Sequence, residues 1–305
     1  MSTAAIAFPP VAHTDQVLAI VNRNASGLGR TARARSAAGW AVARALRAAG
    51  AEAELIVTES IDDLLTAVFA AEGRRVVLVG GDGALHALAN LGLTLPPEIA
   101  LIPAGRANNI ARGLGIPTDL AAAARLAVRG RARAFDLVDV HAPGRWLRAV
   151  EGVSLGFQAA ARARYHAENS GALLAGSVAL ARTLLELPRF RARVSFDGAP
   201  AEELAFEQAF LSTLPYFAYG LRVNPVADPR DGADEAIVVR ARSRREAVGV
   251  LLAARRGRPL DAGLRRWRTA EVLDPVPVAV DGESLGVTTV RLEVLGRALR
   301  VVAGS

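Results

Sequence analysis

The chain has 305 residues, of which 51% are hydrophobic and 22% charged, and it carries a net charge of +7. That length favours two domains over one, and the composition is typical of a folded globular protein. Cysteine and lysine are both absent, which excludes disulfides, zinc–thiolate sites, thiol nucleophiles, lysine-dependent Walker A loops and Schiff-base cofactors.

The first part of the chain alternates short β-like runs with helical stretches. Strands are expected at residues 18–21, 54–57, 76–79 and 99–102, and helices at residues 31–49 and 62–71. Strands that alternate with helices in this way indicate a parallel sheet covered by helices on both faces. We therefore expect residues 1–134 to form an α/β domain.

The pattern changes after Asp136 to one made mostly of strands, with the domain boundary near residues 130–136. Apolar or alternating runs stand at residues 138–140, 147–155, 193–196, 209–213, 236–240, 276–280 and 287–295. Helices are expected only around residues 158–187, with a break near 170–171, and around 244–256. This succession predicts a mostly antiparallel β-sandwich in residues 135–305. A final strand at residues 298–303 leaves open a return to the first domain.

The strand at residues 76–79 ends in Gly80-Gly81-Asp82-Gly83, with a helix expected directly after it. Ligands bind at the carboxyl edge of parallel sheets, and glycine permits a close approach of the backbone. The start of a helix offers free N–H groups and a positive dipole end to a phosphate. Asp82 could hold a metal ion or a substrate hydroxyl. The alternative is an ordinary turn in which Asp82 caps the helix.

Two further polar turns are expected at the same edge of the sheet. Gly105, Arg106 and Asn108 follow the strand at residues 99–102, and Asn22 and Ser26 follow the first strand. Arginine can bind a phosphate as a two-pronged donor, and asparagine supplies a neutral donor and acceptor. The alternative is capping by Asn108 with a solvated Arg106.

Taken together, these segments resemble one enzyme family. The order Asn22…Ser26-Gly27, Thr58, Gly80-Gly81-Asp82-Gly83, Gly105…Asn108 and Asp281-Gly282-Glu283 is similar to that of the diacylglycerol kinase catalytic family. That family includes bacterial lipid kinases and sphingosine kinases and is distantly related to NAD kinases. Residues 151–157 and 224–232 also match family segments, so the resemblance covers nearly the whole chain.

The resemblance implies an ATP- and Mg²⁺-dependent lipid kinase that phosphorylates a hydroxyl of diacylglycerol or a related lipid. Its nucleotide would be bound by the α/β domain, at Asn22, Ser26, Thr58, Gly80, Gly81, Asp82, Gly83, Gly105, Arg106 and Asn108. Glu283 corresponds to the residue that accepts the hydroxyl proton, with Asp281 beside it. Asp228, Asp231 and the backbone of Ala233 correspond to a magnesium site. Without the resemblance, Asp281-Gly282-Glu283 would be interpreted as a hairpin turn with exposed acids.

Several residues depart from the family pattern. Threonine, asparagine and glutamate usually follow the first glycine turn, whereas the chain has Ala84, His86 and Ala87. In the second turn a threonine and an aspartate are replaced by Arg106 and Asn109. A proline is replaced by Arg23. These changes could weaken ATP binding, change the phosphoryl donor or abolish turnover.

Three functions are therefore open: a lipid kinase, a non-catalytic relative that binds a lipid or nucleotide, and a kinase of NAD or another soluble alcohol. A transient lipid partner could use Leu173, Leu174, Leu184 and Leu185, although these residues could equally pack in a core. We expect no nucleic-acid partner, because the arginines are dispersed and few aromatic residues could stack on bases. A homodimer remains open.

The location in the cell also follows from the sequence as an expectation. No uncharged apolar run reaches the length needed to cross a bilayer, the longest being residues 169–181. No basic segment precedes an apolar core at the N-terminus, so we expect no secretory signal. These features favour a cytoplasmic protein, or one bound peripherally at the inner face of the membrane.

Overall fold

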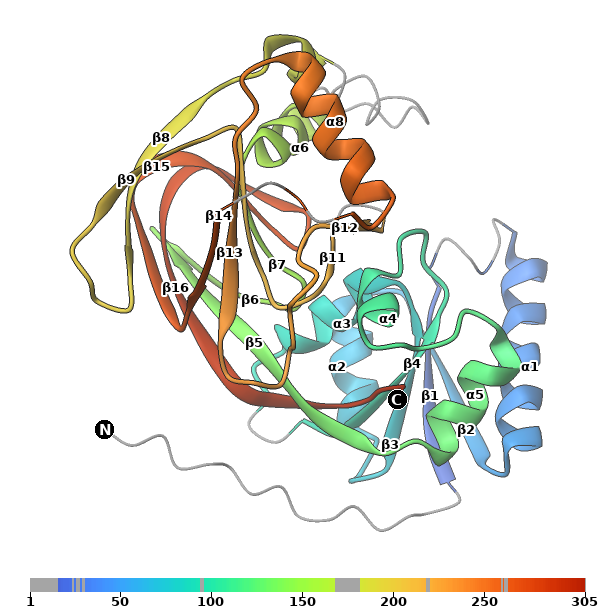
Figure 1. Ribbon diagram of the computed structural model, residues 1–305. Helices are drawn as coiled ribbons and strands as arrows, with labels where there is room; N and C mark the ends of the chain where they lie inside the picture. Colours follow the sequence, from blue (N-terminus) through green and yellow to red (C-terminus); the bar gives the residue numbers. More distant parts are fainter. Residues whose placement is uncertain are drawn as a thin grey trace. The chain divides into compact units, whose positions relative to one another are not determined.

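The computed structural model describes residues 16–23, 25, 28, 31–93, 96–167, 182–217, 220–258, 260 and 263–304 (Figure 1). The chain divides into two compact units. Unit 1 comprises residues 1–136 and 296–305, and unit 2 comprises residues 137–295. The chain passes from one unit to the other within two strands, β5 (Ala132–Ala142) and β16 (Glu283–Val302).

Unit 1 contains a parallel sheet with the strand order β2-β1-β3-β4-β16. Its strands are β1 (Gln16–Asn22), β2 (Glu52–Thr58), β3 (Arg75–Gly80), β4 (Glu98–Pro103) and the last residues of β16. The β3 strand is buried along its whole length, as expected for a strand covered on both faces. The predicted parallel α/β arrangement is therefore confirmed.

Helices cover both faces of this sheet (Figure 1). Helices α1 (Ala32–Ala49) and α5 (Leu120–Arg129) share a core with Val17, Ala19 and Val21 of β1. The alternate residues Leu18 and Ile20 are also fully buried, because successive side chains of a strand point to opposite faces. Helices α2 (Ile61–Phe69) and α3 (Asp82–Ala89) lie on that second face, and α4 (Asn109–Gly113) follows β4.

Unit 2 is built from antiparallel strands, as predicted. Its main path runs β14-β13-β10-β7-β15-β16, with β5 paired to β16 and β6, and β8 paired to β15 and β9. The strands are β6 (Arg145–Ala149), β7 (Gly152–Gly156), β8 (Phe190–Phe196), β9 (Glu202–Phe206), β10 (Gln208–Ser212), β13 (Asp234–Val239), β14 (Gly263–Trp267) and β15 (Thr269–Val280), with a small pair β11 (Tyr216–Phe217) and β12 (Leu221–Arg222). Helices α6 (Phe157–Ala167) and α8 (Arg244–Arg255) complete the unit.

Some sequence-based element boundaries were wrong. The run at residues 147–155 is two strands, β6 and β7, separated at Val150 and Glu151. The runs at 287–295 and 298–303 are one continuous strand of 20 residues, β16. Helix α5 was not predicted, and the break expected near residues 170–171 lies outside the described residues.

In the part of the chain that the structure describes, no helix combines the length and the apolar character needed to cross a bilayer.

Candidate functional site

The carboxyl ends of the unit 1 strands bring several predicted residues to one edge. Asn22, the last residue of β1, lies opposite Thr58, the last residue of β2. On the other side of β1, the β3 strand ends at Gly80, which lies opposite Pro103 of β4. Both glycine turns therefore leave the sheet at the same edge as Asn22 and Thr58, which is where parallel sheets bind ligands.

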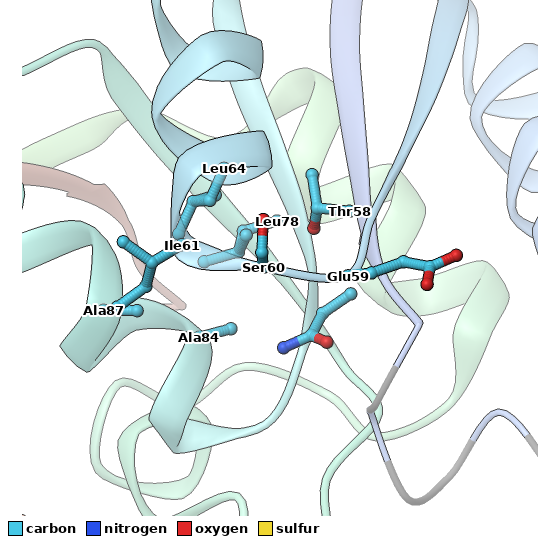
Figure 2. A pocket seen from close by; sticks show the side chains of 9 residues that line it. Thr58, Glu59, Ser60, Ile61, Leu64, Leu78, Ala84 and Ala87 are labelled. Carbon is cyan, nitrogen blue, oxygen red and sulfur yellow. The ribbon is translucent and has the colours of Figure 1, made fainter.

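A hollow of about 170 Å³ opens at this edge. Its lining comprises Asn22, Thr58, Glu59, Ser60, Ile61, Leu64, Leu78, Ala84 and Ala87. Figure 2 shows Thr58 at the end of β2, Ser60 on the β2–α2 connection, and Ala84 and Ala87 across the hollow on α3. Ser60 caps α2 by accepting a hydrogen bond from the Asp63 amide, and the Asp63 carboxylate accepts one from the Ser60 amide. The positive end of the α2 dipole therefore lies at the hollow.

The two glycine turns lie in direct backbone contact. A Cβ atom placed on Gly81 would lie 2.9 Å from the Gly105 Cα, and one placed on Gly105 would lie 2.5 Å from the Gly81 Cα. Neither distance is possible for a real side chain, so both positions require glycine. A Cβ atom on Gly83 would meet nothing within 4 Å. Close packing of the turns therefore explains two of the predicted phosphate-loop glycines, and Gly83 is exposed and open.

Asp82 joins the two turns, and Asn108 stabilises the second one. The Asp82 Oδ1 accepts a hydrogen bond of 3.0 Å from the Ile110 amide, and so caps α4 across the two turns. The Asn108 Oδ1 accepts from the Gly105 amide at 2.9 Å, and its Nδ2 donates to the Gly105 carbonyl at 3.0 Å. Asn108 adopts a left-handed backbone with φ of +50°. The structure therefore gives both side chains a loop-forming role, and a ligand contact remains a prediction for each.

Two of the residues that depart from the family pattern, Ala84 and Ala87, line the same hollow. Ala84 is buried and contributes a methyl group to the lining. Arg106 is exposed at the second turn. Arg23 forms an ion pair with Glu59, which itself lines the hollow. Glu59 belongs to no recognisable motif, so the sequence did not predict it as a site residue. Ser26 lies outside the described residues, as do Leu173 and Leu174.

In unit 2, Asp281 anchors a distant turn of the backbone. Its Oδ2 accepts a hydrogen bond of 2.7 Å from the Val150 amide, and its Oδ1 accepts from the Glu151 and Gly152 amides at 2.9 and 3.0 Å. Asp281 and Gly282 have φ values of +46° and +84°, as the two central residues of a type I′ hairpin turn require. This turn joins β15 to β16, so the hairpin alternative describes the local geometry correctly.

Glu283 is held by a different group. Its carboxylate forms an ion pair with Arg145, and both side chains are about half exposed. The Arg162 Nε donates a hydrogen bond of 2.6 Å to the Gly282 carbonyl, next to Glu283. Asp281 therefore binds backbone amides, whereas Glu283, two residues later, is paired with an arginine side chain. Only Glu283 has the exposure that contact with a substrate hydroxyl requires.

The predicted magnesium ligands are bound to arginine side chains. Both Asp228 carboxylate oxygens accept hydrogen bonds from Arg230, at 2.6 and 3.1 Å. The Asp231 carboxylate accepts from the Ala233 amide at 3.1 Å and pairs with Arg266 at 2.9 Å. Among the described residues, no group of three or more acidic or histidine side chains is arranged to hold a metal ion. This arrangement does not fit an ion unless the arginines move, and the magnesium site remains a prediction.

Two buried acids directly after this segment were not recognised in the sequence. Asp234 is fully buried, and desolvation raises its pKa well above the ordinary value. Desolvation also raises the pKa of Glu235, whose Oε2 accepts a hydrogen bond of 3.0 Å from Asn224. Both acids begin β13, where every residue is buried. An acidic pair that opens an apolar run was the available sequence signal.

Comparisons with known proteins agree with this architecture. Residues 16–140 match the family described as the diacylglycerol kinase catalytic domain, and residues 151–303 match the YegS C-terminal NAD kinase beta sandwich-like domain. Curated relatives named "Probable lipid kinase YegS-like", from Yersinia pestis (strain Pestoides F) and Yersinia pseudotuberculosis serotype O:1b (strain IP 31758), are 40% identical over 70 residues. That match covers 22% of this chain and 24% of each relative, so the chain matches about a quarter of their length.

Solved structures share the fold over nearly the full length. A "putative diacylglycerol kinase" from Bacillus anthracis str. Sterne has a TM-score of 0.72 at 19% identity, covering 95% of this chain and 96% of its own. A second structure of a diacylglycerol kinase from the same strain has a TM-score of 0.68 at 19% identity, covering 95% of this chain and 97% of its own. At this identity the likeness establishes the fold.

Proposed function

Because the chain belongs to the diacylglycerol kinase-like family of lipid kinases with a YegS C-terminal domain, we propose that it transfers the γ-phosphoryl group of ATP to a hydroxyl of diacylglycerol or a related lipid. The observation that carries this proposal is the arrangement at the edge of the unit 1 sheet. Asn22 and Thr58 line a hollow there, and two glycine turns in backbone contact leave the sheet at the same edge.

In this proposal the residues of the edge bind and orient the phosphates. Phosphoryl transfer depends mainly on positioning and on neutralising negative charge. The helix starts of α2 and α3 direct their positive dipole ends to the hollow. The exposed guanidinium of Arg106, on the second glycine turn, supplies a charged phosphate donor, and Ala84 lacks the hydroxyl expected from the family pattern. Magnesium, bound with ATP, would neutralise part of the phosphate charge.

Glu283 is the group we propose for accepting the proton of the lipid hydroxyl. Its carboxylate is exposed enough to reach a substrate, and Arg145 restricts its orientation. Asp281 keeps Glu283 at the start of β16 by fixing the hairpin turn to the Val150–Gly152 backbone. Asp281 thus acts through position and not through contact with the substrate.

The test is an assay of lipid phosphorylation by MgATP, with diacylglycerol dispersed in detergent micelles. We expect lipid-dependent phosphate transfer by the wild-type protein and its loss in Glu283→Gln. Glu293→Gln is the matched control, because Glu293 is an exposed glutamate of the same strand β16. Equal loss in both variants, or full activity in Glu283→Gln, would contradict the role of Glu283.

A second function is favoured by one observation, the replacement of a phosphate-binding hydroxyl by the Ala84 methyl group in the lining of the hollow. A protein that binds nucleotide or lipid without turnover would show calorimetric binding of ATP but no transfer to any lipid. A kinase of NAD or another soluble alcohol would consume ATP with that alcohol and not with diacylglycerol. The same assay, run with each acceptor, separates these possibilities.

A further inference from the structure

Helix α8 of unit 2 exposes apolar side chains where a surface helix normally presents polar ones. Val248, Leu251 and Leu252 are 39%, 40% and 44% exposed. Val248 and Leu252 are four residues apart, so they lie one turn apart on the same face of the helix. Arg245 and Arg255 stand three residues before Val248 and three residues after Leu252, which continues this face at both ends. The exposed face therefore has an apolar centre with an arginine at each end.

The fold of α8 does not depend on these exposed residues. The opposite side of the helix packs on the body of unit 2 through Val250 and Ala254, which join a core cluster with Phe210, Ile237 and Val239. The N-terminus of the helix is also capped, because the Ser243 hydroxyl accepts a hydrogen bond of 3.2 Å from the Glu246 amide. The packing of α8 on unit 2 therefore does not need the exposed apolar side chains. Exposed apolar patches on a protein surface mark interaction sites.

The charge around the strip is strongly positive and largely unneutralised. Residues 242–258 contain six arginines and one glutamate, a net charge of +5. The Glu246 carboxylate accepts a hydrogen bond from the Arg242 amide and so contributes to the helix start. Among the described residues, no carboxylate forms an ion pair with Arg244, Arg245, Arg255, Arg256 or Arg258.

Most arginines elsewhere in unit 2 do have an acidic partner. Among the described residues, ten arginines elsewhere in the unit are paired with acids, whereas Arg222, Arg240 and Arg268 are not. The ten are Arg145, Arg148, Arg164, Arg189, Arg191, Arg193, Arg230, Arg265, Arg266 and Arg291. The free cations are thus concentrated where the apolar side chains are exposed. A surface with both features is complementary to a partner that is apolar below an anionic layer.

We propose that the outer face of α8 docks on an anionic lipid membrane. Val248 and Leu252 enter the boundary between headgroups and acyl chains, and Arg245 and Arg255 bind lipid phosphates while their stems lie along the apolar surface. The proposal deepens the proposed function, since a lipid kinase must reach a substrate in a membrane, but the surface itself is defined without reference to catalysis. A second copy of the chain is a poorer partner, because it would bring two faces of the same positive charge together.

The test is co-sedimentation with lipid vesicles in the absence of nucleotide. Vesicles of phosphatidylcholine are compared with vesicles that also contain phosphatidylglycerol. We expect binding to the anionic vesicles, which weakens as salt is added. Each arginine near an anionic surface strengthens binding by about fivefold, so Arg245→Gln/Arg255→Gln should weaken it about 25-fold. Leu252→Ser, or Val248→Ser as a second variant, should weaken it by about tenfold.

Matched controls make these losses specific to α8. Arg44→Gln/Arg47→Gln removes the same charge from exposed positions of α1, and Leu273→Ser changes a leucine of β15 that is 41% exposed. Both controls should bind vesicles like the wild-type protein. Equal effects of control and α8 variants would overturn the proposal, as would equal binding to neutral vesicles. Self-association that Leu252→Ser abolishes, without vesicle binding by the wild type, would instead assign the face to a second copy.

The two proposals fail in different ways. Loss of docking leaves phosphorylation of diacylglycerol in detergent micelles unchanged, because no bilayer is needed there. If instead the protein binds anionic vesicles but transfers no phosphate to lipid in micelles, the proposed function fails while the docking surface stands. The α8 variants should therefore keep micelle activity and lose activity on anionic vesicles.

Discussion

At the scale of single residues, neighbouring acids in one short motif have separate physical roles. Asp281 uses its carboxylate to accept three backbone hydrogen bonds, from Val150, Glu151 and Gly152. Glu283, two residues later, forms a half-exposed ion pair with Arg145. A motif shared with an enzyme family can thus contain one residue for chemistry and another for geometry, and substitutions distinguish the two.

Asp281→Asn should destabilise unit 2. Asparagine has one oxygen in place of two, and its NH₂ group would face a backbone amide that needs an acceptor. Hydrogen bonds to charged groups contribute about 1.5–3 kcal/mol each, so we expect the free energy of unfolding to fall by about 2 kcal/mol. Glu283→Gln removes the half-exposed ion pair with Arg145, and exposed ion pairs contribute about 0–1 kcal/mol. Urea unfolding of both variants measures this, and equal stability of the two would contradict the anchoring role of Asp281.

The contact between the glycine turns gives a second prediction at this scale. Gly81→Ala or Gly105→Ala would place a methyl group against backbone atoms at 2.9 or 2.5 Å, and such overpacking costs about 1–3 kcal/mol. The turns would have to separate, so ATP binding should weaken together with thermal stability. Gly83→Ala is the control in the same loop, since its methyl group would meet nothing within 4 Å.

Calorimetric titration with ATP and thermal unfolding of these three glycine variants decide the matter. If Gly83→Ala lost as much stability as Gly81→Ala, contact between the turns would not be the reason for glycine at position 81. If Gly81→Ala bound ATP normally despite lower stability, the edge would not be the site of nucleotide binding.

At the scale of elements, a register shift in β15 is stabilised by a residue of the neighbouring strand β8. The pairing of β15 with β16 changes register between Val272 and Val276. Asp274 lies in this interruption, and its carboxylate accepts hydrogen bonds from the Arg193 amide at 2.7 Å and from the Arg193 guanidinium at 2.8 and 3.0 Å. These bonds lower the pKa of Asp274 to about 2. The irregular part of β15 is therefore bound to β8 through the Asp274 carboxylate, whose charge depends on pH.

The effect of pH on this fastening has a definite sign. Asp274 has a folded-state pKa of about 2 against an ordinary value of 3.8, so its stabilising contribution is present above pH 3.8. It is lost as the pH falls through the folded pKa. Asp274→Asn should therefore lower the melting temperature at neutral pH, and the difference from wild type should disappear as the pH approaches about 2.

Melting curves recorded across this pH range test the prediction. Glu293→Gln serves as the control, because Glu293 is exposed and forms no ion pair among the described residues. A deficit of Asp274→Asn that stayed constant down to the lowest pH would show that the carboxylate charge does not fasten the bulge.

At the scale of the whole molecule, local sequence patterns predicted most strands and helices. Features that depend on contacts between residues far apart in the sequence were not predicted. Alternation of strands and helices predicted the parallel sheet, and its topology alone brought Asn22, Thr58 and the glycine turns to one edge. The division of residues 147–155 into β6 and β7 was missed. It depends on hydrogen bonds to Asp281, about 130 residues away, and no local pattern records them.

The candidate site was predictable to a similar extent. Collinear motifs identified the family and named Glu283, but the arginine partners of Glu283, Asp228 and Asp231 were not foreseen. Arg145, for example, reaches Glu283 because β6 folds back on β5 and not because of any spacing in sequence. Side-chain pairing therefore had to come from the structure, as did the exposed strip of α8.

Unit 1 is completed by residues from the far end of the chain. The Glu98 carboxylate is buried between Arg75, at 2.9 Å, and Arg300 of β16. Arg75 also donates hydrogen bonds to the carbonyls of Ala127 and Val128 in α5. The Arg297 amide donates a hydrogen bond of 2.6 Å to Asp136, where the first segment of unit 1 ends. Leu299, Val301 and Val302 of β16 are therefore part of the unit 1 core.

This closure predicts that residues 16–136 cannot fold alone. They would lack the buried side chains of Leu299, Val301 and Val302, which at about 1.5–3 kcal/mol each approach the total stability of a small domain, about 5–15 kcal/mol. They would also leave Glu98 without Arg300, and removing one partner of a buried ion pair costs about 3–5 kcal/mol.

Joining residues 16–136 to 296–304 through a short Gly-Ser linker should restore folding, because the Arg297–Asp136 hydrogen bond places the two ends next to each other. Circular dichroism during urea titration would show a cooperative transition for the fusion and none for residues 16–136. A fusion with Val301→Asp, which puts a charge at a buried position, is the control and should also lack the transition. Cooperative unfolding of residues 16–136 alone, at the same midpoint as the fusion, would mean that β16 only covers an already stable sheet. The expected result would instead show that the end of β16 is an integral part of unit 1. Truncation after Leu295 should then abolish ATP binding, although it removes no residue of the glycine turns.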